Sequence, residues 1–513
     1  MDVALPSVTP EFAGFADVYE AGETQVVWMK LVADLETPVS AMMKIADGQP
    51  NSFLLESVEG GAIRGRYSLI GLRPDLIWRY ADGRTEVNRS ALNSTNDFLP
   101  CPVGDADGPL ASLRALMAES RIELPEQLPP MSAGLFGYMA YDAVRLVEPR
   151  IPDNNPNSLD LPDSLFLRPT VMAIFDALED TLTLITPVWP DDELEAIPAY
   201  DAARARLSSV VSDLDQTLLP CRSEHGRPGH SPITPDSNMS KEAFCDIVKT
   251  CIDYIHAGDA FQIVPSQRFR MPFDLPDFSF YRALRRLNPS PFLFFMNFGK
   301  FSVVGSSPEI LVRVRDGKVT LRPLAGTRPR GATPEEDSAL AENLLNDPKE
   351  RAEHLMLLDL GRNDVGRVAK VGSVKVTEQF SVEYYSHVMH IASNVEGELA
   401  DDCDAIDALL AGFPAGTVSG APKVRAMEII DEVELERRGV YAGCIGYFGA
   451  DGDMDTCIAL RTAVIKDQTL YVQAGCGVVA DSDPEYEYQE TVNKAQALVR
   501  AAEEAEAFAG NNS

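Results

Sequence analysis

Apolar runs on either side of short turn signals recur along this chain, and they constrain its fold more than any other feature. Residues 75–80 and 85–88 flank an Asp-Gly pair at 82–83, and a similar arrangement surrounds the Asp-Gly pair at 316–317. An Asp-Gly pair favours the tight turn of a hairpin, so each arrangement predicts two adjacent antiparallel strands.

Longer helical patterns interrupt these strands. Helices are predicted to begin after Asp347, to span 422–439 and to run over 483–507. The apolar runs near the end of the chain, typical of an antiparallel meander, cover 440–448, 456–465 and 469–479. Strands and helices are mixed without strand–helix–strand alternation, which favours the α+β class over a doubly wound parallel sheet.

Residues 220–240 divide the sequence. Four prolines and two glycines fall in this stretch without apolar periodicity, which is typical of a surface linker. We therefore expect an N-terminal region over 1–219 and a C-terminal region over 241–513. Eight cysteines are scattered without paired spacing, so we interpret them as reduced thiols.

The chain is strongly acidic. Its 45 Lys and Arg residues against 78 Asp and Glu residues give a net charge of −33. A field of this sign repels nucleic acid and anionic membrane surfaces, so neither is expected as a partner. Because the start lacks the pattern of a secretion signal and charges break the long apolar stretches, we expect a cytoplasmic protein. An anionic substrate would need a cation or a few Arg and Lys groups nearby.

Two of the predicted helices carry glutamates three residues apart, Glu350 with Glu353 and Glu487 with Glu490. Positions i and i+3 share a helical face, so four carboxylates converge if the two helices meet. Oxygen ligands of this kind suit Mg²⁺. The alternative for Glu350 is structural, since its place three residues after Asp347 fits a capping box.

Two glycine-containing segments could bind a carboxylate through unhindered backbone N–H groups. Residues 475–477 interrupt an apolar strand and residues 326–327 follow one, and glycines at such places permit the close approach of a ligand. Arg461 and Lys494 could supply positive charge. Packing glycines and surface cations are the structural alternative.

Beyond these physical patterns, several blocks of sequence are familiar. They are FLLES at 53–57, DAFQIVPS at 259–266, GSSPE at 305–309, RPLAGTRPRG at 322–331, EHLMLLDL at 353–360, GTVSGAPK at 416–423 and QAGCG at 473–477. Through these blocks the chain resembles the anthranilate synthase component I family of chorismate-utilising enzymes, from about residue 25 to residue 505.

The resemblance implies a four-layer fold in which two antiparallel sheets are sandwiched between helices. It also implies a lyase reaction that converts chorismate and ammonia into anthranilate and pyruvate, the first step of tryptophan biosynthesis. Mg²⁺ is the implied cofactor, with Glu353 and Glu490 as direct ligands and with Glu350 and Glu487 holding metal-bound water.

The same resemblance implies roles for single residues. Those matched to chorismate binding are Gly326, Thr327, Tyr447, Arg461, Gly475, Cys476, Gly477 and Lys494. Those matched to catalysis are His390, Glu309, Thr417 and Gln262. Of these, Glu309 would protonate the leaving hydroxyl, and His390 would assist the proton shift that accompanies the loss of pyruvate.

Two positions bear on which family member this is. Ala325 stands where some aminodeoxychorismate synthases carry a nucleophilic Lys, and Gln262 stands where isochorismate and salicylate synthases carry a Lys that activates water. Neither side chain can do the work of that lysine, so ammonia is left as the attacking group. Aminodeoxychorismate synthases without the Lys, and a non-catalytic tryptophan-binding homologue, remain alternatives.

A second ligand site is implied away from these residues. Glu56 and Ser57, together with Pro291, Phe292 and Leu293, match the site at which tryptophan inhibits members of the family. The two segments lie on opposite sides of 220–240, so a ligand that bridges them could couple the two regions. A hydrophobic turn at a domain contact is the structural alternative.

The source of ammonia is expected to lie outside this chain. The sequence has no Gly-x-Cys-x-Gly block paired with a downstream His-x-Glu, the pattern of a glutamine-hydrolysing site. The resemblance therefore implies a separate glutamine amidotransferase subunit and a hetero-oligomer.

Overall fold

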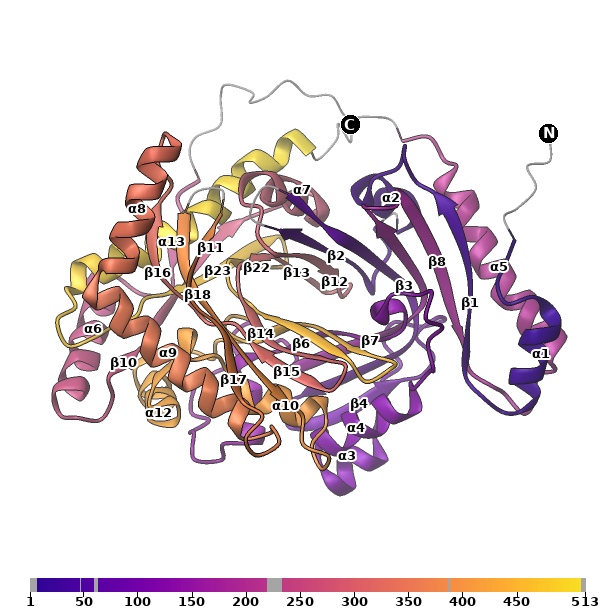
Figure 1. Cartoon of the computed structure of the whole chain (residues 1–513), viewed down its shortest axis with the longest axis horizontal. Coiled ribbons are helices and arrows are strands. Elements are labelled where there is room, and N and C mark those ends of the chain that lie inside the picture. Colours follow the sequence, from indigo (N-terminus) through magenta and orange to yellow (C-terminus); the bar gives the residue numbers. More distant parts are fainter. Residues whose placement is uncertain (1–6, 47, 60–62, 219–232, 386–387, 509–513) are drawn as a thin grey trace.

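Antiparallel pairing dominates this structure. The computed structural model describes residues 7–46, 48–59, 63–218, 233–385 and 388–508. Every strand pair in those ranges is antiparallel, and helices pack around the strands (Figure 1). The expected α+β class with antiparallel strands is confirmed.

Hydrogen bonds join 21 strands of the described chain into one branching network with two arms. The first arm passes through β1 (Gln25–Val32), β8 (Thr181–Val188), β7 (Ser164–Asp176), β3 (Ile63–Ala81), β2 (Ser52–Glu59), β12 (Phe292–Asn297), β13 (Phe301–Ser307), β22 (Thr462–Lys466), β23 (Thr469–Gly475), β11 (Ser266–Pro272) and β9 (Asp236–Ser237).

The second arm also uses β3 and β7. Its other strands are β5 (Leu99–Pro100), β4 (Arg84–Asn88), β6 (Gly134–Met139), β20 (Cys444–Gly449), β21 (Met454–Ile458), β14 (Ile310–Arg315), β15 (Lys318–Leu321), β18 (Val388–Glu398), β16 (Leu324–Pro329) and β17 (Lys375–Tyr384). A separate pair joins β10 (Gln262–Ile263) to β19 (Gly420–Ala421).

The two longest shared strands make the arms continuous. One half of β3 pairs with β2 and the other with β4, while opposite halves of β7 pair with β8 and β6. β3 bends at Arg73, whose φ of 51° is left-handed, and its register with β7 shifts between Pro74 and Leu76. The two sheets implied by the resemblance are therefore not separate, because β3 and β7 run through both.

Helices cover each arm and bury its apolar side chains. One cluster packs the first arm against α1 (Phe12–Glu20), α2 (Pro38–Ile45), α5 (Ala196–Leu214), α7 (Asp277–Leu287) and α13 (Pro484–Glu504). Another packs the second arm against α4 (Pro109–Glu119), α9 (Pro348–Gly366), α10 (Ala405–Gly412) and α12 (Lys423–Val433). A third cluster consists mainly of strand residues from both arms.

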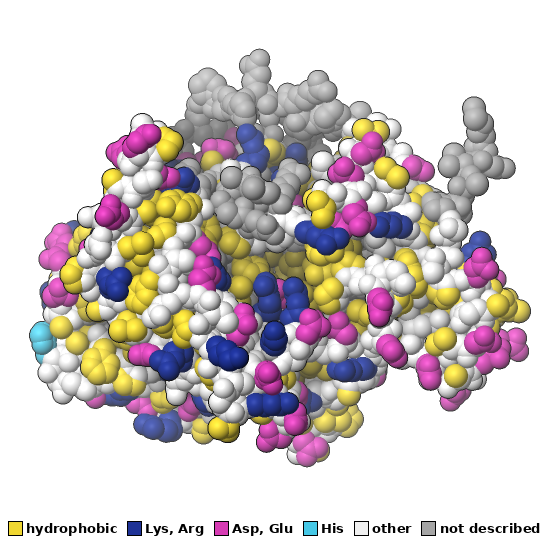
Figure 2. All heavy atoms as spheres, viewed as in Figure 1, with side chains coloured by type: hydrophobic (Ala, Val, Ile, Leu, Met, Phe, Trp, Pro, Cys, Tyr) yellow, Lys and Arg dark blue, Asp and Glu magenta, His cyan; other side chains and the backbone are white. Residues whose placement is uncertain are grey.

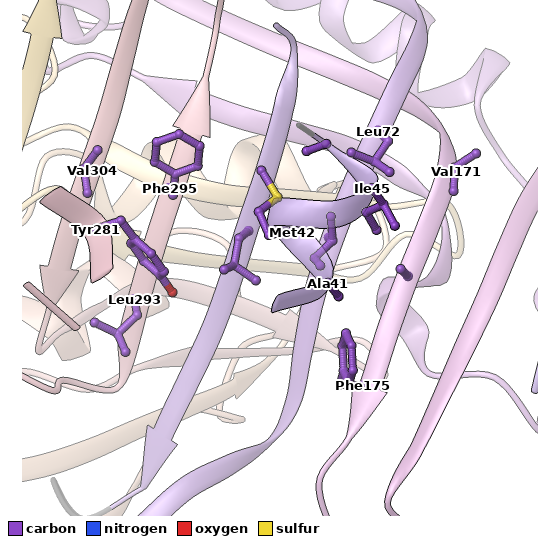
Figure 3. Packing of buried hydrophobic residues seen from close by; sticks show 14 of the residues in the cluster. Ala41, Met42, Ile45, Leu72, Val171, Phe175, Tyr281, Leu293, Phe295 and Val304 are labelled. Atoms are coloured by element: carbon purple, nitrogen blue, oxygen red, sulfur yellow. The ribbon is translucent and has the colours of Figure 1, made fainter. Parts of the chain in front are cut away.

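The first cluster is drawn in Figure 3, where Ile45 of α2 lies beside Leu72 of the first arm, between Met42 and Val171. The remaining helical segments are α3 (Pro102–Asp107), α6 (Lys241–His256), α8 (Pro334–Asn346), α11 (Gly416–Ser419), η1 (Pro130–Ser132), η2 (Tyr141–Leu146) and η3 (Ala505–Phe508).

Signals that depend on neighbouring residues are confirmed. The Asp-Gly pairs at 82–83 and 316–317 turn β3 into β4 and β14 into β15, with φ angles of 50° to 72°. Asp347 accepts the N–H groups of Lys349 and Glu350 at the start of α9, and Asp483 caps α13. Side-chain acceptors of this kind satisfy backbone donors that a helix leaves unpaired.

Two predicted boundaries are wrong. α12 ends at Val433 rather than near Gly439, because Glu434 is already extended. The run 456–465 is two strands, and Arg461, with a left-handed φ of 46°, lies between them. β21 pairs within the second arm and β22 within the first, so the chain crosses between the arms here. Both strands are buried, and the apolar pattern therefore continues across the break.

Most of the predicted linker 220–240 lies outside the described residues, which resume at 233. Strands from either side of it pair directly, β2 with β12 and β6 with β20. The division into regions at this stretch stays a prediction. Among the helices of the described chain, none is long and apolar enough to cross a bilayer.

Candidate active site

Glu309 is a buried carboxyl with few polar partners. It lies between β13 and β14 and is 5% exposed. The hydroxyl of Thr417, on α11, donates to Glu309 Oε2 at 3.2 Å, and the backbone N–H of Leu324 donates to Oε1 at 3.4 Å. Burial raises the pKa of Glu309 to about 8, although both hydrogen bonds act in the opposite direction. The side chain therefore holds a proton at neutral pH.

His390 has the opposite character. It lies on β18 opposite Thr327 of β16, and burial lowers its pKa to about 4, helped by the charge of Arg461. Its Nδ1 lies 2.9 Å from the carbonyl oxygen of Gly326 and 3.2 Å from the hydroxyl of Thr327. A carbonyl can only accept, so Nδ1 carries the ring proton and Nε2 is the basic nitrogen.

At the end of β23 other groups closely surround the backbone, so that no side chain would fit. Gly475 is the last residue of the strand, and a Cβ atom there would lie 2.7 Å from the carbonyl oxygen of Pro265 and 2.8 Å from the hydroxyl of Tyr441. Lys494 of α13 donates to the carbonyl oxygen of Gly475 at 3.0 Å. Cys476 is buried in the cluster between α6 and α12, and burial raises the pKa of its thiol, as expected for a packing residue.

The predicted carboxylates come from α9 and α13. Burial raises the pKa of Glu353, and the neighbouring charges of Glu350 and Glu490 raise it further. The pKa of Glu487 is likewise raised by burial and by Glu490. The charges of Glu350 and Glu490 thus act on the other two carboxylates, as expected if the two helices meet.

These carboxylates do not form a closed metal-binding set. Within the described residues no group of three or more His, Cys, Asp or Glu side chains could hold a metal as it stands. Two of the carboxylates bind cations of the chain instead: Arg328 donates to Glu350 at 2.9 Å and Lys494 to Glu490 at 2.8 Å. The bond to Arg328 also replaces the capping-box contact considered for Glu350.

Two features nevertheless fit a ligand beside these carboxylates. Gln262 is 3% exposed and donates through Nε2 to Glu353 at 3.1 Å, while its buried Oε1 has no partner among the residues that the structure describes. Gly326 has a φ of +72°, and a Cβ atom there would lie 2.9 Å from Glu350 Oε2, while one at Gly477 would lie 2.8 Å from Gln262 Nε2. Any residue with a side chain would fill these places, whereas glycine leaves them open.

A separate cavity of about 680 Å³ lies beside this region. It is lined by all five residues matched to tryptophan binding, namely Glu56, Ser57, Pro291, Phe292 and Leu293. β2 and β12 bring them together, because Phe292 pairs with Ser57 and Leu293 with Glu56. The molecule is hollowed in the middle of the face shown in Figure 2, with hydrophobic side chains deep inside and Lys and Arg side chains at the edge.

Glu56 lines this cavity, and both of its carboxylate oxygens are paired with residues that do not line it. Tyr281 donates to its Oε2 at 2.5 Å, and Arg285 donates to Oε2 at 2.5 Å and to Oε1 at 2.9 Å. Both partners lie on α7, where Tyr281 packs beside Leu293 (Figure 3). The other wall of the cavity includes Tyr385, whose ring centre lies 5.5 Å from that of His390.

One residue matched to chorismate binding is not brought to the others. Tyr447 lines the 680 Å³ cavity and packs on Phe136, with ring centres 5.4 Å apart. Tyr441 is the tyrosine beside Gly475 instead, and sequence reasoning missed it. Both tyrosines lie in apolar sequence at or just before β20. Only the tertiary structure therefore shows which of them borders Gly475.

Comparison with known proteins agrees with this picture. A family model described as chorismate binding enzyme matches residues 73–500. The chain therefore belongs to the family of chorismate-binding enzymes.

Within that family, its relatives are named anthranilate synthase component 1. The protein from Cereibacter sphaeroides is 57% identical over 97% of this chain and 98% of its own length. That from Pseudomonas putida is 48% identical over 92% of this chain and 93% of its own. The resemblance read from the sequence blocks is thereby confirmed.

Solved structures share the fold. The crystal structure of anthranilate synthase component I from Streptococcus pneumoniae is 38% identical, covers 85% of this chain and 92% of its own, and has a TM-score of 0.72. The menaquinone-specific isochorismate synthase from Escherichia coli, at 21% identity, covers 94% of this chain and 95% of its own with a TM-score of 0.68. The latter likeness shows the fold alone.

Proposed function

We propose that this chain is the subunit that converts chorismate and ammonia into anthranilate and pyruvate. The observation that carries the proposal is the pair of groups held in opposite proton states at neutral pH, a protonated Glu309 and a neutral His390. An acid and a base whose pKa values are pushed apart in this way can each serve one step of a two-step reaction.

Chorismate is a dicarboxylate, and the net charge of −33 opposes its capture. The residues of the site would offset that field locally. Arg461 and Lys494 supply positive charge, while the backbone at Gly326, Gly475 and Gly477 accepts close approach of a carboxylate. We include Tyr441 among these residues because its hydroxyl borders Gly475.

We assign Mg²⁺ to the carboxylates of α9 and α13, where Glu350 and Glu490 would exchange their contacts with Arg328 and Lys494 for the ion and its water. Glu353 and Glu490 would hold the ion directly, and Glu350 and Glu487 would hold its bound water. Oxygen donors of this number and charge are those that Mg²⁺ prefers. When bound, the ion neutralises the substrate carboxylate and restrains it while charge develops on the ring.

In the first step Glu309 gives its proton to the ring hydroxyl, which leaves as water as its C–O bond breaks. A C–N bond forms at the diene carbon next to the one that bears the enolpyruvyl group, both ring double bonds shift toward the carbon that loses its hydroxyl, and the new ammonium group returns a proton to Glu309. The unpartnered Oε1 of Gln262 can accept an N–H of the incoming ammonia. An amide takes no proton from water, which favours ammonia over water as the nucleophile.

In the second step Nε2 of His390 removes the hydrogen on the ring carbon that bears the new amine. The C–O bond to the enolpyruvyl group breaks, its methylene carbon gains a proton, and pyruvate leaves an aromatic ring. Replacing His390 with Ala should therefore let the aminated, still pyruvylated intermediate accumulate, as chromatography of the reaction would show. Normal anthranilate output from that variant would refute this role.

Partner and regulation complete the proposal. A glutamine amidotransferase subunit would supply ammonia in a hetero-oligomer. The name of the relatives, component 1, supports this because it implies a second component. Tryptophan would inhibit the enzyme from the 680 Å³ cavity, which is lined by the residues matched to its site.

We also propose that the two arms serve as the inner layers of a four-layer sandwich, and that the protein works in the cytoplasm.

One assay tests the proposed reaction. Purified protein is incubated with chorismate, MgCl₂ and an ammonium salt, and ortho- and para-aminobenzoate are separated by chromatography. We expect anthranilate with an equal amount of pyruvate. Para-aminobenzoate as the main product would favour an aminodeoxychorismate synthase instead, and tryptophan binding without any product would favour a non-catalytic homologue.

A further inference from the structure

Arg438 lies behind the candidate site at a junction of four chain segments. It is 2% exposed and pairs with Glu434, which is also buried, at 2.6 Å. Its remaining donors reach two backbone carbonyls, Val264 at 2.6 Å and Val418 at 2.7 Å. A buried arginine that satisfies all of these acceptors at once holds them in a defined geometry, because its donors form a rigid fork.

Each acceptor belongs to a segment that carries a site residue. Val264 follows the strand of Gln262, and Val418 is the residue after Thr417, which donates to Glu309. The two segments also pair with each other in β10 and β19. A shift of Arg438 would therefore move the amide next to Glu353 and the hydroxyl next to Glu309 together.

Glu434 links this junction to β23, the strand that ends at Gly475. Its Oε1 accepts the backbone N–H and the hydroxyl of Ser266, both at 2.8 Å. Ser266 pairs with Gly475 in the register of β11 and β23. On the other side, the Arg438 guanidinium lies 5.6 Å from the ring centre of Tyr441, the residue whose hydroxyl borders Gly475.

We propose that Arg438 is a positioning residue for the lyase site: with Glu434 it sets the relative places of Gln262, Thr417, Gly475 and Tyr441. It touches none of the reacting groups itself. Because this inference rests on the proposed function, its test includes chorismate binding as well as turnover.

Arg438→Lys is the informative variant. A lysine can keep the ion pair with Glu434, but it cannot make the same set of contacts to both carbonyls. We expect kcat/KM for chorismate to fall about 10- to 100-fold, since displacements of about 1 Å in a site cost this much. Calorimetry without ammonia should show weaker chorismate binding.

Arg168→Lys is the matched control. Arg168 is also buried, at 7% exposure, pairs with Asp75 at 2.7 Å and lies 4.2 Å over the ring of Trp189. Its contacts among the described residues are with Asp75, Glu119, Ser120 and Trp189, away from the candidate site, so its variant should lose thermal stability and keep kcat and KM within about twofold. Equal losses of activity in both lysine variants, or normal kinetics in Arg438→Lys, would overturn the proposal.

Ser266→Ala covers the case in which Arg438→Lys does not fold. It removes one bond to Glu434 on the side of Gly475, so KM for chorismate should rise about 3- to 10-fold with kcat within about twofold. A KM equal to that of the unchanged protein would count against the junction.

If the unchanged protein binds chorismate without making anthranilate, the proposed function fails and binding by these variants still decides the positioning role. Absence of chorismate binding by the unchanged protein would overturn both.

Discussion

Glu309 and Glu56 are both buried glutamates, yet their surroundings differ. Glu56 of β2 meets the guanidinium of Arg285 and the hydroxyl of Tyr281, both on α7. Within the described part of the chain, Glu309 meets one hydroxyl and one backbone N–H, with no cation. Burial without a countercharge keeps a carboxyl protonated, whereas a paired carboxylate holds structure in place. The comparison separates a group suited to proton transfer from one suited to binding and packing.

The largest effect should come from removing the proton of Glu309. Glu309→Gln keeps the shape of the side chain but cannot protonate a leaving hydroxyl, so kcat should fall about 10³-fold, within the range of general acid catalysis. Anthranilate fluorescence in a stopped assay measures it. A loss of less than tenfold would show that Glu309 is not the acid.

The same variant should change stability in a pH-dependent way. Burial raises the pKa of folded Glu309 to about 8 from its usual 4.5, so the unfolded chain releases a proton that the folded chain keeps. The stability linked to this group is present below pH 4.5 and is lost as pH rises to about 8. Thermal melts at pH 9 should therefore show Glu309→Gln to be more stable than the unchanged protein.

The next effect concerns the carboxylates near Gln262. Glu353→Gln should raise the Mg²⁺ concentration for half-maximal activity about 10- to 100-fold, because it removes a proposed direct ligand. Isothermal titration with MgCl₂ provides a readout independent of turnover. Glu342→Gln, on the exposed face of α8, is the control and should leave Mg²⁺ binding unchanged; an unchanged affinity in Glu353→Gln would contradict the ligand assignment.

Glu56→Gln tests the other side of the comparison. It leaves the partly buried guanidinium of Arg285 without its carboxylate, which should cost less than the about 3–5 kcal/mol typical of a fully buried pair. Tryptophan should then inhibit only at concentrations about tenfold higher, while kcat stays within about threefold. Steady-state inhibition curves measure both. Unaltered inhibition in a folded variant would remove Glu56 from the regulatory proposal.

The smallest effect should come from Thr417→Val. The Thr417 hydroxyl lowers the pKa of Glu309, so its loss should move the alkaline limb of the kcat profile upward from about pH 8 by less than one pH unit. Thr456→Val is the control, since the Thr456 hydroxyl donates to the carbonyl of Val312 at 2.7 Å rather than to Glu309. A downward shift in Thr417→Val would contradict the assignment.

Sequence alone predicted the features of this molecule that depend on interactions between residues close together in the chain. The Asp-Gly hairpins, the cap at Asp347 and the i, i+3 glutamates follow from local geometry. The meeting of α9 with α13 followed only from the family resemblance. What neither supplied depends on contacts between distant segments: the pairing of Glu350 with Arg328, and the placing of Tyr441 rather than Tyr447 beside Gly475.

The role of Glu309 as an acid was implied by the resemblance, but the burial that raises its pKa became visible only with the fold. The residue follows the buried strand β13, and its two partners come from 15 and 108 residues further along the chain. Likewise, the break at Arg461 could not be read from an apolar pattern, since hydropathy reports burial and carries no information about which arm a strand joins.

The continuity of β3 and β7 through both arms bears on how the protein can be divided in the laboratory. A fragment that encodes only residues 241–513 would expose β12 and β20 as bare edges, since their partners β2 and β6 would be missing. Such edges invite aggregation. Soluble expression of the catalytic residues should therefore require both halves of the gene, either fused or produced together.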